Sequence, residues 1–403
     1  MNHQAPIRTL LFSTLYPSSV RPGHGIFVET RLRELLGNGR VQTKVVAPVP
    51  WFFSSHARFG GYARMASTPL RETYQGVDVQ HPRYFIPPKV GMSIAPFTLA
   101  MGAVPAIQRL LDEGFDFDLI DAHYYYPDGV AAALLSRYFK RPLVITARGS
   151  DINLVSNYLI PRKLIQWAAS NAFASIGVSA ALTGAMSRLG MATSKLITMR
   201  NGIDLVRFNP MPKAEARKVL GWAAVPTLIS VGHLVEDKGH HIAIEALSQL
   251  EHFNLVIVGE GPERQALERL ATRLGLHLRV AFTGRIEQMD LPVYYSAADI
   301  LVLPSSREGW PNVLLEAMAC GTPVVATDVG GVAEIVTTDV AGRRLRKRSS
   351  NELVSAVQSL WDCYPDKLAV RTHAESFSWQ STTVDQIGLF ECITDKCRKN
   401  CNA

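Results

Sequence analysis

Two glutamates, Glu308 and Glu316, are separated by seven residues that include a glycine, a proline and an asparagine. Glu308 follows an apolar run, 299–304, that is typical of a buried strand. Glu316 lies on a helix predicted to begin near Pro311, because proline is favoured in the first helical turn. Its helix neighbours are apolar, and a buried carboxylate is costly without partners. Hydroxyls of a sugar or a ribose would be suitable partners, although two isolated glutamates could also lie on a solvated helix face and at a helix N-terminus.

A lysine near a predicted helix start supplies the opposite charge. Lys238 and Gly239 follow the predicted strand 227–232 and precede a helical segment. A cation beside the free backbone N–H groups of a helix start can bind a diphosphate. His233 lies in the same turn and can also donate to a phosphate, with less charge near neutral pH. A lysine in this place is most often only solvated, so the diphosphate interpretation depends on the context.

The first half of the chain contributes a loop with two glycines, Gly23 and Gly25, on either side of His24. The loop follows the predicted strand 7–14, and its glycines allow a phosphate or a sugar to approach the backbone closely. Its spacing is not G-x-G-x-x-G, which argues against a dinucleotide-dependent oxidoreductase. A plain turn between a strand and a helix is the alternative.

Three further polar residues stand at the ends of predicted strands. His123 ends the strand 117–123 and could reach a ligand or lie in the core. Arg148 follows the strand 143–147, where its guanidinium could bind a phosphate or an anionic sugar but could not act as a base. Asp151 could accept hydrogen bonds from hydroxyls or cap the next helix.

The elements that position these residues follow a regular pattern. Short apolar runs alternate with amphipathic segments, and the pattern restarts after Asn201. This alternation predicts an α/β fold in which parallel sheets are covered by helices on both faces. Two such series predict two doubly wound, Rossmann-like domains facing each other across a cleft, with ligands at the carboxyl ends of the strands. The predicted strands are 7–14, 43–48, 117–123, 143–147 and 175–179, then 227–232, 254–261, 279–284, 299–305 and 322–327.

Composition narrows the class of protein. The 403 residues are 47% hydrophobic and 19% charged, which excludes a highly charged disordered chain and allows two full cores. Residues 1–200 hold 21 Lys and Arg against 11 Asp and Glu, whereas residues 201–403 hold 21 against 24. The basic excess therefore belongs to the first half and predicts an anionic partner there.

Two other features set limits on localisation and metal binding. The uncharged segment Val90–Gln108 is interrupted by Pro96 and Pro105, which favours a buried helix over a membrane span. The N-terminus lacks a signal-peptide pattern, so a cytoplasmic location is expected. The five cysteines show no zinc-ligand spacing, and no metal ligands are predicted.

The stretch from Glu308 to Ala326 resembles the donor-site signature of retaining glycosyltransferases of family 4, which have the GT-B architecture. It reads Glu-Gly-Trp-Pro-Asn over 308–312 and Glu-Ala-Met-Ala-Cys-Gly-Thr-Pro-Val-Val-Ala over 316–326. Asn201-Gly-Ile-Asp204 is similar to the segment that joins the two domains in that family. The resemblance covers almost the whole chain and is most specific in the second half. The family's usual arginine and histidine are replaced by His233 and Arg148, respectively.

The resemblance implies a role for each candidate residue. Glu308 would approach the hydroxyls of the transferred sugar, and Glu316 would accept from the ribose of the nucleotide. The residues expected to act in catalysis are Glu308, Lys238, Arg148 and His123. Those expected to bind the donor are Gly25, His233, Gly309, Trp310, Pro311, Asn312, Glu316 and Arg285, and those expected to bind the acceptor are Gly23, His24 and Asp151.

The resemblance also implies an activity and its setting. The expected enzyme moves a sugar from a nucleotide-diphosphate sugar to a glycan acceptor, lipid-linked, in bacterial surface polysaccharide biosynthesis, without a metal or other cofactor. The opening Tyr16-Pro-Ser-Ser is similar to enzymes of teichuronic-acid type. The expected domains are 1–203, which binds the acceptor and to which helices in 378–403 return, and 204–377, which binds the donor. The basic first half would contact the inner face of the cytoplasmic membrane.

Two other functions remain open on the sequence alone. One is a nucleotide-sugar epimerase on the same fold, and the other is an inactive protein that binds a nucleotide sugar or a glycan. The replacements at His233 and Arg148 make the second alternative conceivable. Nucleic acid is not an expected partner, because no recognised nucleic-acid motif accompanies the basic half.

Overall fold

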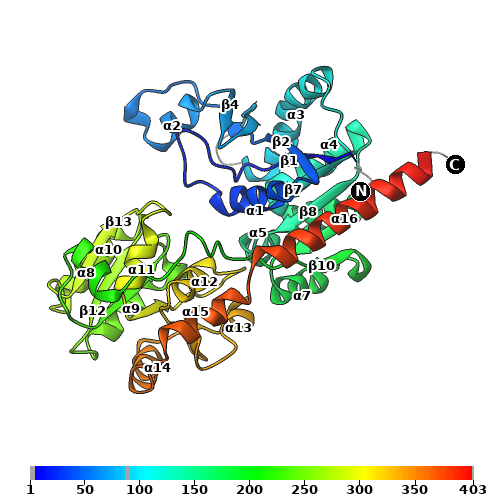
Figure 1. Cartoon of the computed structure of the whole chain (residues 1–403). Coiled ribbons are helices and arrows are strands. Elements are labelled where there is room, and N and C mark those ends of the chain that lie inside the picture. Colours follow the sequence, from blue (N-terminus) through cyan, green and yellow to red (C-terminus); the bar gives the residue numbers. More distant parts are fainter. Residues whose placement is uncertain (1–4, 87–90, 402–403) are drawn as a thin grey trace. The chain divides into compact units, whose positions relative to one another are not determined.

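The computed structural model describes residues 5–86 and 91–401 and divides into two compact units (Figure 1). Unit 1 comprises Met1–Arg200 with Gln380–Ala403, and unit 2 comprises Asn201–Trp379. The two segments that connect the units pair with each other, since Ile203 N donates to Phe377 O at 2.9 Å. Both segments belong to unit 2, whose boundaries lie a few residues outside those expected at 203/204 and 377/378. The expected domains also include residues 1–4, 87–90 and 402–403, which lie outside the described residues.

Unit 1 is built on one sheet with the strand order β10-β9-β8-β7-β1-β2-β5-β4. All neighbouring strands in it are parallel except β4 and β5. Its central strands are buried along their whole length, as expected for a sheet covered on both faces. The strands are β1 (Ile7–Phe12), β2 (Val41–Val46), β4 (Arg71–Tyr74), β5 (Val77–Gln80), β7 (Leu119–His123), β8 (Leu143–Ala147), β9 (Ala174–Gly177) and β10 (Leu196–Thr198), with β3 (Val49–Pro50) and β6 (Arg83–Tyr84) as a separate pair.

The helices of unit 1 include one from the C-terminal end of the chain. Ile387, Phe390 and Ile393 on α16 pack in one cluster with Leu35 and with apolar residues of the strands, so α16 completes the core of this unit (Figure 1, red). The helices are α1 (Ile26–Gly37), α2 (Gly61–Ser67), α3 (Gly91–Asp112), α4 (Val130–Phe139), α5 (Ser150–Asn153), α6 (Leu159–Asn171), α7 (Ala180–Arg188) and α16 (Trp379–Cys401), with short turns η1 (Ala57–Phe59), η2 (Tyr125–Gly129), η3 (Val155–Asn157) and η4 (Thr193–Lys195).

Helix α3 covers the uncharged segment singled out in the sequence. It is one continuous helix with Pro96 and Pro105 inside it. Among the described residues, it is the single helix that by length and composition could cross a membrane, and 44% of its most apolar window is buried inside the protein. Its buried face includes Leu99, Ala103 and Ile107. Val90, at the start of the predicted segment, lies outside the described residues.

Unit 2 has a second sheet, with the strand order β13-β12-β11-β14-β15-β16, and all its neighbouring strands are parallel. Its core joins the strands to α9, α10 and α14. The strands are β11 (Thr227–Val231), β12 (Asn254–Val258), β13 (Val280–Gly284), β14 (Ile300–Leu303), β15 (Val324–Thr327) and β16 (Gly342–Leu345). The helices are α8 (Lys213–Leu220), α9 (His240–Leu247), α10 (Arg264–Arg273), α11 (Leu291–Ala297), α12 (Asn312–Ala319), α13 (Val332–Ile335), α14 (Ser350–Asp362) and α15 (Lys367–Glu375), with the short turn η5 (Glu236–Lys238).

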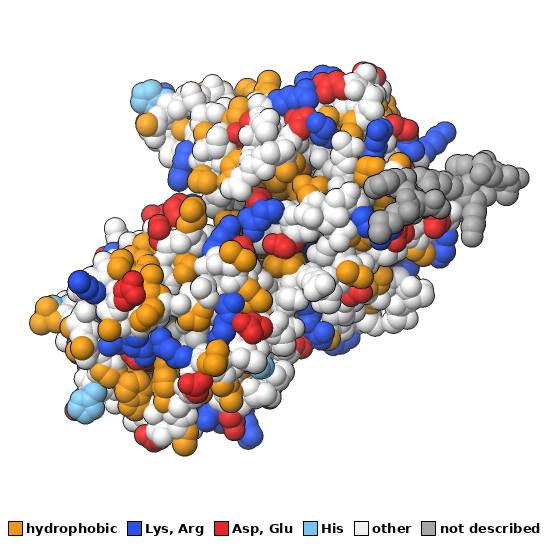
Figure 2. Space-filling model, viewed as in Figure 1, with side chains coloured by type: hydrophobic (Ala, Val, Ile, Leu, Met, Phe, Trp, Pro, Cys, Tyr) orange, Lys and Arg blue, Asp and Glu red, His pale blue; other side chains and the backbone are white. Residues whose placement is uncertain are grey.

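Both units are doubly wound α/β structures, which confirms the fold class predicted from the alternating pattern. The segment 380–403 carries three basic and three acidic residues, so the basic excess of residues 1–200 is that of unit 1. On the face that Figure 2 shows, charged side chains of both signs are interspersed with hydrophobic ones.

Candidate functional site

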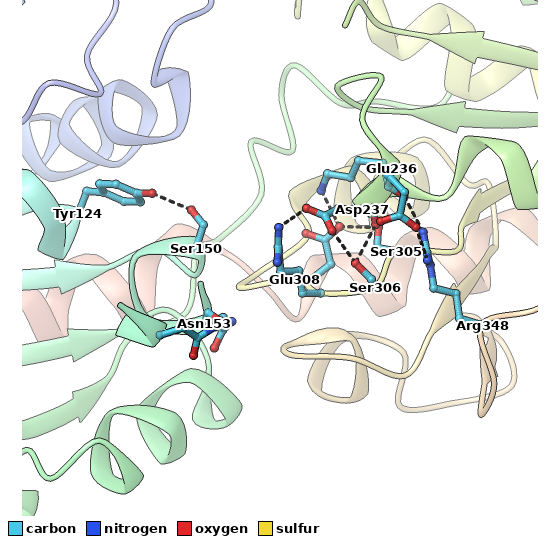
Figure 3. A network of polar contacts seen from close by, with 12 residues as sticks. Tyr124, Ser150, Asn153, Glu236, Asp237, Ser305, Ser306, Glu308 and Arg348 are labelled. Carbon is cyan, nitrogen blue, oxygen red and sulfur yellow. Dashed lines mark hydrogen bonds and ion pairs between the residues drawn. The ribbon is translucent and has the colours of Figure 1, made fainter. Parts of the chain in front are cut away.

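The strongest candidate in unit 2 lies at the switch point of its sheet, where β11 and β14 are neighbours. The connections after these two strands run to opposite sides, and ligands of doubly wound sheets bind at such points. Lys238 follows β11 and Glu308 follows β14. Lys238 Nζ donates to Glu308 Oε1 at 2.6 Å, and Ser305 Oγ donates to the same oxygen at 2.8 Å (Figure 3). The two sequence-predicted residues are therefore brought together, with the Lys238 side chain 29% exposed and that of Glu308 8% exposed.

The backbone around this pair is held by close contacts between the two loops. Gly239 adopts a φ of 71°, and a Cβ at this position would lie 2.1 Å from the carbonyl oxygen of Pro304. Only glycine permits this approach, which brings the turn η5 against the end of β14. Ser306 N donates to Asp237 O at 2.8 Å, and the Asp237 carboxylate accepts from Ser306 Oγ and from Arg307 (Figure 3).

Arg348, which sequence reasoning missed, fastens the same turn from a third loop. Its Nε donates to Pro304 O at 3.0 Å, one terminal nitrogen donates to Glu236 Oε1 at 2.7 Å, and the other donates to Glu236 O at 2.6 Å (Figure 3). The guanidinium thus connects the loop before α14 with η5 and with the end of β14. Its plane of several donors suits this role. We infer that Arg348 positions Lys238 without touching it.

Of the residues between Glu308 and Glu316, one has its side chain in the core and others form the start of α12. The Trp310 side chain is buried and its ring lies 6.1 Å from that of Phe377. Contacts of Trp310 with a ligand would therefore come from its backbone. Pro311 precedes α12, which begins at Asn312, and Asn201 Nδ2 donates to Asn312 Oδ1 at 3.4 Å. Gly309 is half-buried in the loop before them.

Glu316 has a partner within the protein that sequence reasoning did not foresee. Tyr295 OH donates to Glu316 Oε2 at 2.8 Å, and the carboxylate is buried on α12. Burial raises the pKa of Glu316, and the hydrogen bonds from Tyr295 and Gln288 act in the opposite direction. The apolar neighbours of Glu316 signalled its burial correctly. The tyrosine lies 21 residues earlier and leaves no local signal.

The other donor-site candidates of unit 2 lie at strand ends. His233 is exposed and lies in the connection between β11 and α9 that also contains Lys238. Arg285 directly follows β13, is 43% exposed and pairs with Glu287 at 3.5 Å. Both side chains are accessible, and neither contacts the Lys238–Glu308 pair in an observed hydrogen bond or ion pair among the described residues.

In unit 1 the switch point lies between β1 and β7. Ser13 Oγ donates to His123 O at 3.0 Å, which joins the ends of these strands. Thr14 donates from its backbone and its hydroxyl to the Asp128 carboxylate. Asp128 is fully buried, and burial raises its pKa to about 7. The loop after β1 is thereby tied to the segment after β7.

The glycine loop of unit 1 closes back on the same strand end. Gly25 precedes α1 with a φ of 69°, and a Cβ there would lie 2.2 Å from the carbonyl carbon of Leu15. His24 Nε2 lies 3.0 Å from Thr14 O, so the ring is turned toward the loop's own backbone. Burial lowers the pKa of His24. Gly23 is half-buried beside it.

His123 and Arg148 lie in direct contact. Arg148 Nη2 lies 2.7 Å from His123 Nδ1, and His123 Nε2 lies 3.4 Å from Asp121 Oδ2. An arginine can only donate, so Nδ1 of His123 is the acceptor and its proton is on Nε2, facing Asp121. His123 is 1% exposed, and burial lowers its pKa to about 4 against the opposing effect of Asp121. The neutral ring is thus placed to orient Arg148, and both of its nitrogens face groups of the protein.

A helix from the end of the chain supports this network. Gln386 on α16 accepts from Arg31 Nε at 2.8 Å and donates to Asp121 Oδ2 at 3.1 Å. Arg31 is 2% exposed, and burial lowers its pKa to about 10. Arg148 also stacks over the ring of Phe27 at 5.1 Å. The result is a buried relay from Gln386 through Asp121 and His123 to Arg148.

Asp151 is occupied by the backbone. Its carboxylate accepts from the N–H groups of Tyr125, Arg148 and Gly149 at 2.8, 3.1 and 2.7 Å and is fully buried. Of the two roles left open by the sequence, these contacts favour positioning the loop after β8 over binding an acceptor. Nearby, Tyr124 OH and Ser150 Oγ lie 2.8 Å apart (Figure 3).

These arrangements suit recognition of an anionic, hydroxyl-rich ligand. A lysine and a carboxylate stand at one switch point, and a half-buried guanidinium, that of Arg148, stands beside the other. Within the described parts of the chain, no three His, Cys, Asp or Glu side chains are grouped so that they could hold a metal ion. The groups that these strand ends offer to a ligand are cations, carboxylates and backbone donors.

Comparisons with known proteins agree with this character. Residues 212–376 match the family described as Glycosyl transferases group 1, and residues 58–207 match Glycosyltransferase Family 4. A relative in Bacillus subtilis (strain 168), the glycosyltransferase TuaC named for teichuronic acid biosynthesis, is 34% identical over 82% of this chain and 83% of its own. In Escherichia coli (strain K12), WcaL, a glycosyltransferase named for colanic acid biosynthesis, is 30% identical over 72% of this chain and 74% of its own.

Solved structures share the fold. Sucrose-phosphate synthase from Thermosynechococcus elongatus has a TM-score of 0.81 at 20% identity, over 98% of this chain and 100% of its own. The Anabaena protein HepE, solved in complex with UDP-glucose, has a TM-score of 0.73 at 22% identity, over 96% and 99%.

Proposed function

Because the chain belongs to glycosyltransferase family 4 and has the GT-B fold, we propose that it transfers a sugar from a nucleotide-diphosphate sugar to a hydroxyl of a growing glycan. The observation that carries this proposal is the Lys238–Glu308 pair at the switch point of unit 2. The names of two relatives, which refer to teichuronic and colanic acid, support a role in bacterial surface polysaccharide biosynthesis. The complex of HepE with UDP-glucose supports a nucleotide sugar as donor.

The two members of the pair would take different parts of the donor. Lys238 can donate to the diphosphate, whose charge increases as the glycosidic bond breaks. Glu308 can accept from hydroxyls of the transferred sugar. In the absence of a ligand the two side chains neutralise each other, and the donor would replace this contact with two new ones. His233 and the backbone at the start of α12 would add donors near the same strand ends.

In unit 1, Arg148 would serve the position that a histidine holds in many relatives. Its guanidinium can bind a phosphate or an anionic group of the sugar, and His123 and Asp121 orient it. We propose that the anomeric configuration is retained by attack on the face from which the diphosphate leaves, with the leaving phosphate accepting the proton of the acceptor hydroxyl. No pair of carboxylates of the glycosidase type and no metal ion are needed for this step.

The acceptor would be a lipid-linked glycan bound by unit 1, and unit 2 would bind the donor. In the loop before α1, Gly23 and His24 would contribute to the acceptor site, whereas Gly25 would approach the donor. The basic excess of unit 1 supports a location at the inner face of the cytoplasmic membrane, because anionic lipids attract Lys and Arg.

A panel of UDP- and GDP-sugars tests the donor assignment by thermal shift, since a ligand that binds the folded state raises its melting temperature. The preferred donor is then incubated with and without a lipid-linked glycan extract, and products are analysed by NMR. We expect transfer with retention of the anomeric configuration. Free epimerised nucleotide sugar without any acceptor would instead identify an epimerase, and binding without turnover would identify an inactive binding protein.

A further inference from the structure

The segment that follows β3 in unit 1 combines aromatic and basic side chains on the surface. Between Trp51 and Arg64 the sequence contains five aromatic residues, together with His56, Arg58 and Arg64, and no carboxylate. Trp51, Phe53 and Tyr62 are 53, 66 and 61% exposed. Large aromatic side chains so close together are rarely left in water unless they contact a partner.

These rings pack on each other instead of on the core. The ring of Phe52 lies 4.5 Å from that of Phe53, 5.3 Å from that of Phe59 and 5.1 Å from that of Tyr62. The turn η1 buries none of its residues, and α2 buries only Ala63. The cluster is therefore preformed at the surface, so that little conformational entropy would be lost when it binds.

The apolar surface continues onto the neighbouring strand. Trp51 N donates to Tyr84 O at 2.7 Å, which places Trp51 beside the end of β6. The next residues, Phe85 and Ile86, are 55 and 38% exposed. Two separate segments of the chain thus present aromatic and aliphatic groups at the same end of the β3–β6 pair.

The charged side chains within this segment are all of one sign. Arg58 and Arg64 are exposed, and the guanidinium of Arg58 lies 4.7 Å from the centre of the Phe59 ring. The whole stretch from residue 35 to residue 71 contains no Asp or Glu. Aromatic rings that lie at the headgroup level, next to arginines that face lipid phosphates, are typical of proteins that bind at a membrane interface.

We propose that this aromatic–basic segment, Trp51–Arg64, docks unit 1 onto an anionic lipid bilayer. The aromatic rings enter the headgroup region, and Arg58 and Arg64 contact lipid phosphates. The docking surface would hold the enzyme where a lipid-linked acceptor is presented, and in this respect the inference rests on the proposed function. It adds a defined docking surface to that function.

Flotation with vesicles tests the surface. Wild-type protein is mixed with vesicles of phosphatidylcholine containing phosphatidylglycerol, or of phosphatidylcholine alone, at low and high salt. We expect it to float with the anionic vesicles at low salt, and less at high salt. The variant Trp51→Ala/Phe53→Ala/Tyr62→Ala and the variant Arg58→Glu/Arg64→Glu should each lower the partition coefficient by about tenfold or more, since each basic residue near an anionic leaflet contributes appreciably.

Matched variants separate this segment from general effects of charge and hydrophobicity. Arg137→Glu/Arg188→Glu makes the same change in net charge at two other exposed positions of unit 1. Val206→Ala/Leu278→Ala/Met289→Ala removes exposed apolar groups from unit 2. Both controls should float like the wild type. Equal flotation of segment variants and controls, or a wild type that does not float, would overturn the proposal and point to a protein partner.

The same samples are examined for donor binding by thermal shift without vesicles. Segment variants should bind the donor as the wild type does, because the segment lies outside the proposed donor site. A wild type that floats but binds no nucleotide sugar would contradict the proposed function and leave the docking surface standing. The melting temperature without ligand shows whether each variant is folded.

Discussion

The two units present their candidate residues in opposite ways. In unit 2, Lys238 and Glu308 form an ion pair on two loops, and the lysine remains partly open to water. In unit 1, Asp121 and His123 are buried beneath the end of the sheet, are fixed by Gln386 from α16, and hold the half-buried Arg148. A ligand can replace a pair that it reaches through a partly exposed lysine, whereas the buried residues of unit 1 can only orient the group that they hold. We infer that unit 2 changes its contacts on binding and that unit 1 is already organised.

The two arrangements should also respond differently in folding stability when one of their residues is replaced. Because Lys238 is partly exposed and Ser305 Oγ also donates to Glu308, replacing one partner of this ion pair should cost unit 2 little stability. Removing a member of a buried network leaves another group unpaired and costs stability. Substitutions in unit 2 should therefore affect function alone, and those in unit 1 should affect function and folding together.

The largest effect is expected for Lys238→Ala and Glu308→Ala. Each should lower the rate of transfer by about a hundredfold to a thousandfold. Losses of this size are typical when an enzyme loses one group that stabilises the charge developing in the transition state. The melting temperature should stay close to that of the wild type. Lys347→Ala is a suitable control, because this exposed lysine of unit 2 makes its observed hydrogen bond through the backbone. Full activity of both site variants in folded protein would exclude the proposed donor site.

A smaller loss of activity, about a hundredfold, is expected for Arg148→Ala with the preferred donor. Arg148→Lys should recover only part of it, because an ammonium group lacks the planar pair of donors. In contrast to the unit 2 variants, both should also lower the melting temperature. Unchanged turnover of Arg148→Ala would show that this arginine does not replace the histidine of related enzymes.

Arg348 offers a milder test within unit 2. In Arg348→Lys the three contacts to Pro304 and Glu236 cannot all be kept, so η5 and Lys238 should be held less firmly. We expect KM for the donor to rise by about tenfold with a smaller change in kcat, since Arg348 acts through the position of Lys238. A change in kcat alone would argue against a positioning role.

The smallest effect is expected in how the free energy of unfolding of each unit depends on pH. Burial lowers the pKa of His123 in unit 1 and of His240 in unit 2 to about 4. A histidine with a depressed pKa contributes stability that is present above its unfolded pKa of about 6.5 and is lost as the pH falls toward 4. Each should account for at most about 3 kcal/mol of this loss. Unfolding experiments between pH 7 and pH 4 should show a shallower pH dependence for His240→Gln and for His123→Gln; an unchanged slope in both would contradict these pKa shifts.

The sequence predicted one of these two regions better than the other. The motif from Glu308 to Ala326 is continuous, and the alternating apolar runs placed Lys238 and Glu308 after predicted strands, although only the structure shows that these strands are neighbours. Arg348 and Tyr295 were missed, because their contacts join loops or helices that are far apart in the sequence. In unit 1, Gln386 lies 265 residues from Asp121, and nothing local signals their contact.

Some elements of the fold were missed for a related reason. The strands β4 and β5 are short and lie at the edge of the sheet, where polar side chains replace the apolar pattern of buried strands. The pair β3–β6 has two residues in each strand, too few to leave a periodic signal. By contrast, the buried strands β7, β8, β11 and β14 coincide closely with their predicted runs.

The central claim is that Lys238 binds the diphosphate and Glu308 binds the sugar of one donor. Calorimetric titration of wild type, Lys238→Ala and Glu308→Ala with the preferred nucleotide sugar and with its nucleoside diphosphate tests this most directly. The account predicts that Lys238→Ala weakens binding of both ligands, whereas Glu308→Ala weakens binding of the nucleotide sugar and leaves that of the diphosphate unchanged. Wild-type affinity of both variants for both ligands would contradict it.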